Sequence, residues 1–138
     1  MRFLIVSSLI AISAIAPAAS AMTYEEAKAS GVSPVTGSEM VMCAVYWSAW
    51  NESLNPDYYG EGSGIWSSSF VEKLNPEIQR AAALETADYW FGRAKADFEA
   101  HDDLDAFHQQ IYDAPTYDVE ALDERKFMQL LGECARPD

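Results

Sequence analysis

Two cysteines that lie 91 residues apart, Cys43 and Cys134, constrain the fold of this chain more than any other feature of its sequence. Each lies on a stripe of apolar residues whose members recur three or four positions apart, the spacing of one helix face. Both stripes are expected to face a shared core, so a disulfide would join an early helix to the end of a late one. Closing such a loop contributes about 4–5 kcal/mol in the chain-entropy model, comparable to the stability of a small domain. The other stripe members are Met40, Trp47 and Trp50, and Phe127, Leu130 and Leu131.

The first twenty-one residues indicate the compartment in which these two cysteines are located. One early cation, Arg2, precedes an apolar run from Phe3 to Ile15. Ala19-Ser20-Ala21 then supplies the A-x-A pattern after which signal peptidase cuts. The alternative is an uncleaved membrane anchor, but a spanning helix needs about 20 mainly apolar residues, and Pro17 interrupts this segment. The pattern therefore favours a cleaved leader.

We predict that residues 1–21 are a cleavable signal peptide and that residues 22–138 form one helical domain, periplasmic or secreted, with no membrane attachment after cleavage. Two thiols in an oxidising compartment usually pair. A redox-active pair would lie close together, as in C-x-x-C. The sequence therefore predicts a structural disulfide between Cys43 and Cys134.

The chain is strongly acidic, with a formal net charge of −13. Removing the leader removes one cation, Arg2, and takes the charge from −13 to −14. A field of this sign repels phosphate backbones and anionic lipid, so binding to nucleic acid or to a membrane surface is disfavoured. A basic protein partner would be attracted, although solubility alone is the simpler interpretation.

Helix start and stop signals predict an all-α bundle of about four main helices. Capping boxes at Thr23-Tyr24-Glu25-Glu26 and Thr36-Gly37-Ser38-Glu39 begin a short helix ending at Gly31 and a long one ending near Leu54. No segment shows sustained strand alternation, so antiparallel helices are expected to pack around one core.

The second half of the chain predicts the longest helix, from Pro76 to about Ala100, followed by a shorter one capped by Asp102 or Asp103. One bent helix over residues 76–112 is the alternative. A last helix begins at Thr116 or Asp118 and ends near Cys134. The residues of the longest helix expected to face inward are Ala81, Leu84, Ala87, Phe91, Ala94 and Phe98.

His101, Asp105 and His108 form a candidate metal site. On one continuous helix, their spacing would project all three to the same face. Imidazole and carboxylate groups in that arrangement could hold zinc or a similar ion. The sequence identifies no matching ligands on a second helix, and the alternative is a polar margin beside an apolar stripe.

A glycine-rich segment that carries Tyr58, Tyr59 and Trp66 forms a candidate partner-binding loop. Glycines permit tight turns, and aromatic rings give flat contact surfaces at low entropic cost. The alternative is that the rings fold back onto the bundle. The aromatic residues at 46–50 and 89–91 are expected to form the core, with a ligand pocket between helices as the alternative.

No catalytic, dinucleotide-binding or phosphate-binding motif is complete in the chain, and no cofactor is predicted. The leading hypothesis is a non-enzymatic protein-interaction module of unknown partner, such as an inhibitor, an immunity protein or a chaperone-like protein. A small-molecule or metal carrier in the same compartment is the alternative.

The leader generates the first testable prediction. The exported protein is expected to begin at Met22 and to contain no titratable thiol. Intact-mass analysis before and after treatment with a thiol-specific reagent measures both properties. Retention of residues 1–21, or labelling of a cysteine without reduction, would contradict the prediction.

Overall fold

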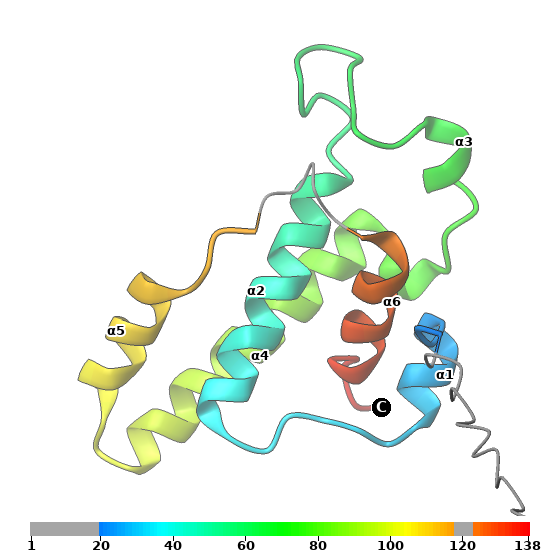
Figure 1. Ribbon diagram of the computed structural model, residues 1–138. Helices are drawn as coiled ribbons and strands as arrows, with labels where there is room; N and C mark the ends of the chain where they lie inside the picture. Colours follow the sequence, from blue (N-terminus) through cyan, green and yellow to red (C-terminus); the bar gives the residue numbers. More distant parts are fainter. Residues whose placement is uncertain (1–19, 118–122) are drawn as a thin grey trace, which may run out of the picture.

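The computed structural model describes residues 20–117 and 123–138, which contain six α-helices, one short 3₁₀ helix and no strand (Figure 1). The predicted all-α fold with four main helices is thereby confirmed, while residues 1–19 of the predicted leader lie outside the described ranges. The elements are α1 (Tyr24–Ala29), α2 (Gly37–Ser53), α3 (Ser68–Val71), η1 (Pro76–Ile78), α4 (Arg80–Ala100), α5 (Leu104–Asp113) and α6 (Glu124–Glu133).

Both predicted capping boxes are present. Thr23 and Thr36 each accept a hydrogen bond from the backbone N–H three residues on, and the glutamate there accepts one in return. Glu39 also accepts a bond from the Val35 amide. These backbone donors lower the pKa of Glu39, because they stabilise its charged form. The start of α1 and of α2 is therefore determined by residues adjacent to each in sequence.

Helices α2 and α4 cross each other at the centre of the molecule, with α5 on one side and α6 on the other (Figure 1). Three buried tryptophans fill this centre. The indole N–H groups of Trp47 and Trp90 donate to the same acceptor, the carbonyl oxygen of Cys134, at 2.7 and 2.6 Å. The Trp50 indole donates to the Ile78 carbonyl at 2.8 Å. Each of these buried indole N–H groups thus has a hydrogen-bond acceptor, and the bonds link the core rings to backbone segments around them.

The disulfide between Cys43 and Cys134 is present, as predicted, with the two Cα atoms 5.3 Å apart. It joins the middle of α2 to the residue that follows α6, and both cysteines are buried. Cys134 therefore anchors the C-terminal segment in two ways, through its sulfur to α2 and through its carbonyl oxygen to tryptophans of α2 and α4.

The predicted inward face of α4 is partly wrong. Leu84 and Phe91 are 51% and 42% exposed, and Ala81 is also exposed. The buried face instead passes through Trp90, which must meet the Cys134 carbonyl. With Trp90 in place of Phe91 as the central contact, the buried face is turned by less than one residue, because Ala87, Ala94 and Phe98 stay buried as predicted. The buried residues of α4 are Ala83, Thr86, Ala87, Trp90, Ala94 and Phe98.

Helix α4 ends at Ala100 and α5 begins at Leu104, so the two do not form one bent helix. Asp102 adopts a left-handed backbone conformation, with φ of 54°, and Asp103 is the N-cap of α5. Asp123 caps α6 by accepting from two backbone N–H groups. The predicted helix start at Thr116 is wrong, and Asp118 lies outside the described residues. No helix in the described ranges combines the length and apolar character needed to cross a bilayer.

Helix α1 packs against α6 through a glycine. A Cβ atom added at Gly132 would come within 2.5 Å of the Tyr24 carbonyl oxygen and 2.6 Å of the Ala27 Cβ. The backbones of the two helices can approach this closely because residue 132 has no side chain. Gly92, on α4, is a natural comparison, because a Cβ there would meet nothing within 4 Å.

Gly132→Ala is therefore expected to lower the free energy of unfolding by about 1–3 kcal/mol, since the added methyl group overpacks the contact between α1 and α6. Gly92→Ala should leave stability unchanged or raise it by up to about 1 kcal/mol, through helix propensity. Urea unfolding of both variants measures the difference. Equal effects of the two substitutions would contradict the proposed backbone contact.

Candidate functional site

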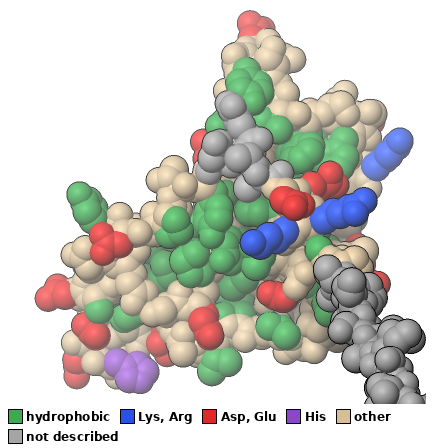
Figure 2. Space-filling view, viewed as in Figure 1, with side chains coloured by type: hydrophobic (Ala, Val, Ile, Leu, Met, Phe, Trp, Pro, Cys, Tyr) green, Lys and Arg blue, Asp and Glu red, His purple; other side chains and the backbone are tan. Residues whose placement is uncertain are grey.

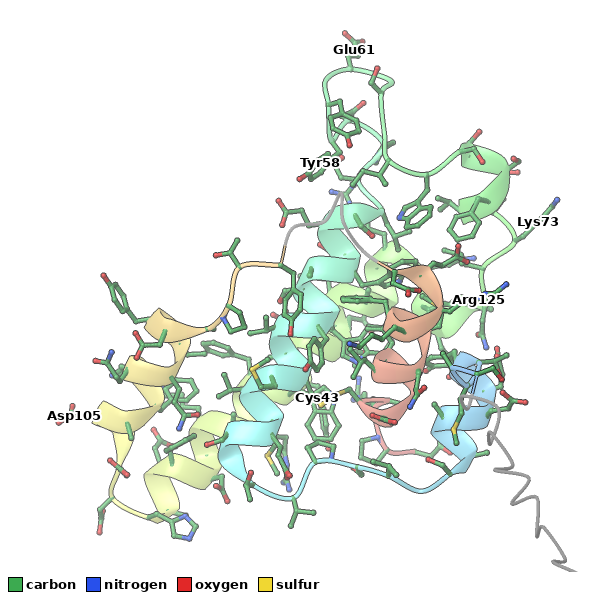
Figure 3. The ribbon with its side chains drawn as sticks, viewed as in Figure 1. Cys43, Tyr58, Glu61, Lys73, Asp105 and Arg125 are labelled. Carbon is green, nitrogen blue, oxygen red and sulfur yellow. A yellow bond between two sulfur atoms is a disulfide. The ribbon has the colours of Figure 1, made fainter. Side chains whose placement is uncertain are left out.

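Residues 55–66, named here the aromatic loop, project from the bundle beyond the end of α2 (Figures 1 and 3). Hydrogen bonds within the loop close it on itself. The Tyr59 amide donates to the Ser63 carbonyl at 2.8 Å. The Asp57 carboxylate accepts from the Gly62 amide at 2.8 Å. The projecting segment is therefore an ordered turn with its own backbone pairing.

Two glycines allow this turn. Gly60 and Gly62 have φ values of 125° and 72°, in the region that residues with a side chain rarely adopt. A Cβ added at either would meet no atom within 4 Å, so the requirement for glycine here comes from backbone conformation and not from crowding. The short glycine spacing thus determines the shape of the loop.

Trp66, one of the predicted partner-binding residues, packs onto the bundle at the base of the loop. Its indole N–H donates to the Ser53 hydroxyl at 3.1 Å, and its ring stacks on Phe70 with centroids 4.8 Å apart. Its centroid lies 5.9 Å from that of Trp50 in the core. For this residue the structure matches the alternative interpretation, in which the ring folds back.

Tyr58 and Tyr59 lie further out on the loop, with ring centroids 5.0 Å apart in an edge-to-face arrangement. Tyr59 is 57% exposed. Figure 3 shows Glu61 at the tip, and the Asp57 side chain is also exposed. The outer part of the loop therefore combines an aromatic surface with two carboxylates.

Ser53 is a residue of this site that sequence reasoning missed. It is fully buried, and its hydroxyl donates to the Trp50 carbonyl at 2.7 Å while accepting from the Trp66 indole. It therefore links the aromatic loop to the core. The signal in the sequence was a small polar residue three positions after Trp50, on the same helix face.

The structure separates the three residues of the candidate metal site. His101 caps the end of α4, where its Nδ1 lies 2.7 Å from the Asp97 carbonyl oxygen. Asp105 and His108 belong to α5, beyond the break at Asp102. The expectation that all three share one continuous helix is therefore wrong. The described residues contain no group of three or more His, Cys, Asp or Glu side chains placed to hold a metal ion.

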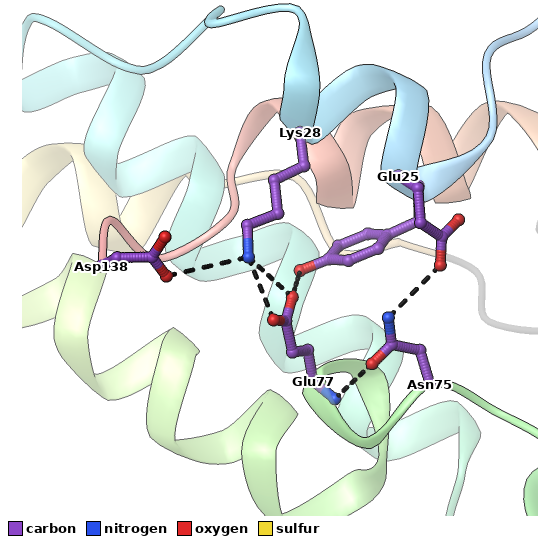
Figure 4. Close-up of polar contacts among 6 residues, drawn as sticks. Glu25, Lys28, Asn75, Glu77 and Asp138 are labelled. Carbon is purple, nitrogen blue, oxygen red and sulfur yellow. Dashed lines mark hydrogen bonds and ion pairs between the residues drawn. The ribbon is translucent and has the colours of Figure 1, made fainter.

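A cluster of polar side chains joins α1 to η1 (Figure 4). The Glu77 carboxylate accepts from the Tyr24 hydroxyl at 3.0 Å and from the Lys28 ammonium at 3.0 Å through each oxygen. The bonds from Lys28 and Tyr24 lower the pKa of Glu77. Burial, reinforced by Glu77, raises the pKa of the Tyr24 hydroxyl. Tyr24 is therefore a neutral donor at physiological pH, and the cluster acts as a tether between elements.

The aromatic residues expected to form the core do so in part, because Phe91 is 42% exposed. Trp47, Trp50 and Trp90 are buried, while Tyr46 and Tyr89 lie at the margin of the core. Tyr46 contacts Tyr117, with centroids 5.3 Å apart. Burial, followed by the bond to Tyr46, raises the pKa of Tyr117 to about 12.

No protein-family model, curated protein or solved structure matches the chain.

The polar cluster predicts a pH-dependent effect of Glu77→Gln. Folding lowers the pKa of Glu77. The contribution of Glu77 to the free energy of unfolding is therefore present above its pKa in the unfolded chain and is lost as pH falls through its pKa in the folded protein. Because the Glu77 carboxylate is exposed, Glu77→Gln is expected to lower the free energy of unfolding at pH 7 by about 1 kcal/mol at most. Urea unfolding at pH 7 and in acid should show a difference from wild type only at pH 7. Glu72→Gln, which makes the same charge change elsewhere, is the control, and an equal loss in that variant would contradict the assignment.

Proposed function

We propose that this chain is an exported, non-enzymatic protein-interaction module whose aromatic loop contacts another protein. One observation carries the proposal: an ordered turn projects from the bundle and presents exposed Tyr59 with the carboxylates of Asp57 and Glu61. Both cysteines are consumed by the disulfide, so neither supplies a thiol for nucleophilic chemistry.

The order of the loop supports a role in binding. A segment already held in one conformation loses less entropy when it binds than a flexible segment does. Backbone bonds and the clamp from Asp57 to Gly62 hold this turn, while Trp66 fixes its base to the core. Tyrosine is enriched among the residues that dominate binding energy at interfaces.

The charge of the surface favours a basic partner. From Ala29 to Glu72, a stretch that contains α2 and the aromatic loop, the sequence carries no Lys or Arg. Complementary potentials accelerate association and select partners. An inhibitor or immunity protein that inserts this loop into a basic cleft is consistent with both the shape and the charge.

The loop predicts a partner whose retention depends on Tyr59. The mature protein serves as bait for a periplasmic extract of its own source, and captured proteins are identified by mass spectrometry. Tyr59→Ala is expected to weaken binding of the specific partner by about tenfold or more, the loss of ~1.4 kcal/mol or more that characterises an interface hot spot. Glu61→Gln should reduce the association rate through the lost charge.

Tyr112→Ala is the matched control, because Tyr112 is an 87% exposed tyrosine on α5, away from the loop. It is expected to retain the partner at wild-type affinity. Equal retention by the Tyr59 and Tyr112 variants would contradict the proposed site. Recovery of a bound small molecule by native mass spectrometry, with no protein partner, would instead favour a carrier.

A further inference from the structure

A groove runs along α2 on the side that faces α5. The α2 residues Val45, Ser48 and Glu52 are part of its lining. Ile111 of α5 and the exposed Phe91 of α4 also line it. Figure 2 shows apolar side chains gathered over α2, between α5 and α6. The aromatic loop contributes no residue to the lining, so this is a separate surface.

The size of the groove indicates what kind of occupant fits. Its volume is about 290 Å³, at or below the lower end of the range of roughly 300–1,000 Å³ typical of small-molecule sites. It is therefore suited to a few side chains of a larger partner. Its lining along α2 extends from Ala44 to Glu52, about 12 Å or two helical turns. That length matches the apolar anchors i to i+7 of a helix laid in a groove.

The charges around the groove indicate the sign of the partner. Glu52 is the one charged side chain among the lining residues. Helices α2 and α5 contain acids and no Lys or Arg, and the connecting residues 114–117 contain no charge. In Figure 2, acidic side chains without Lys or Arg lie on the α5 side of the apolar patch, while Lys and Arg gather toward α6 together with further acidic side chains. A second copy of this chain, with a net charge of −13, would be repelled.

We propose that this groove binds an amphipathic helix of a basic partner protein. Apolar side chains of that helix enter the space between Val45, Ser48 and Ile111, where they cover the exposed edge of Phe91. A Lys or Arg on the margin of the helix pairs with Glu52. Burial of apolar surface supplies the affinity, and the acidic rim selects the charge of the partner.

The probe is a synthetic helical peptide of Leu and Lys, about four turns long, with leucines at i, i+3, i+4 and i+7. Fluorescence anisotropy measures its affinity for the mature protein. Ser48→Trp fills the groove without changing the net charge, and Ser48 is exposed, so the variant is expected to fold. It should weaken binding by about tenfold or more.

Glu52→Gln and Glu72→Gln form a matched pair, because they make the same charge change at the groove and at the residue that follows α3. The Glu52 variant should bind the peptide about two- to fivefold more weakly, as for an exposed ion pair, and the Glu72 variant should bind as wild type does. Amide shifts in NMR spectra should change at residues 44–52 and 111–117. Tyr59→Ala, which tests the aromatic loop, should bind this peptide normally.

The proposal would be overturned by an absence of peptide binding to the wild type or by wild-type affinity in Ser48→Trp. Equal weakening by both glutamate variants would also overturn it, because it would indicate attraction by net charge alone. Shifts confined to the aromatic loop would also overturn it, by assigning the peptide to the other surface. The Tyr59→Ala variant is tested separately by capture of a partner protein. A failure of the peptide to bind the groove would therefore not decide the proposed role of Tyr59.

Discussion

The arrangement of the molecule depends on the convergence of two buried indole N–H groups on the carbonyl oxygen of Cys134. An unsatisfied buried donor costs about 1–3 kcal/mol. The indole N–H groups of Trp47 and Trp90 would each carry this cost if the Cys134 carbonyl moved away. The disulfide to Cys43 anchors the same residue from α2. The end of α6 is thus bound to both central helices, and α1 follows because it packs closely against Gly132.

This constraint also explains why the two sides of α2 differ. On one side, α6 supplies two large buried side chains, Phe127 and Leu131, and the disulfide follows at its end. On the other side, α5 buries a single residue, Phe107. The weaker cover leaves the ring of Phe91 exposed and the groove along α2 open. An uneven distribution of core contacts therefore creates the apolar surface for which we propose a helical partner.

The two proposed surfaces share one electrostatic character and differ in construction. The aromatic loop is ordered by its own backbone bonds and by Trp66 at its base, so it can enter a cleft of a partner. The groove is a recess between helices, so it can receive a segment of a partner. Acidic side chains accompany both, which makes a basic protein the common expectation.

The sequence by itself determined the features that depend on neighbouring residues. Capping by Thr23 and Thr36 involves groups three residues apart, so these helix starts were predictable. The cysteine pair was predictable from its apolar helical stripes. Only the tertiary structure decided which face of α4 is buried, because an apolar stripe passes through Phe91 as well as through Trp90. The choice depends on the distant Cys134 carbonyl. The break at Asp102, which separates His101 from His108, and the groove beside α2 likewise depend on how helices pack, which local spacing does not specify.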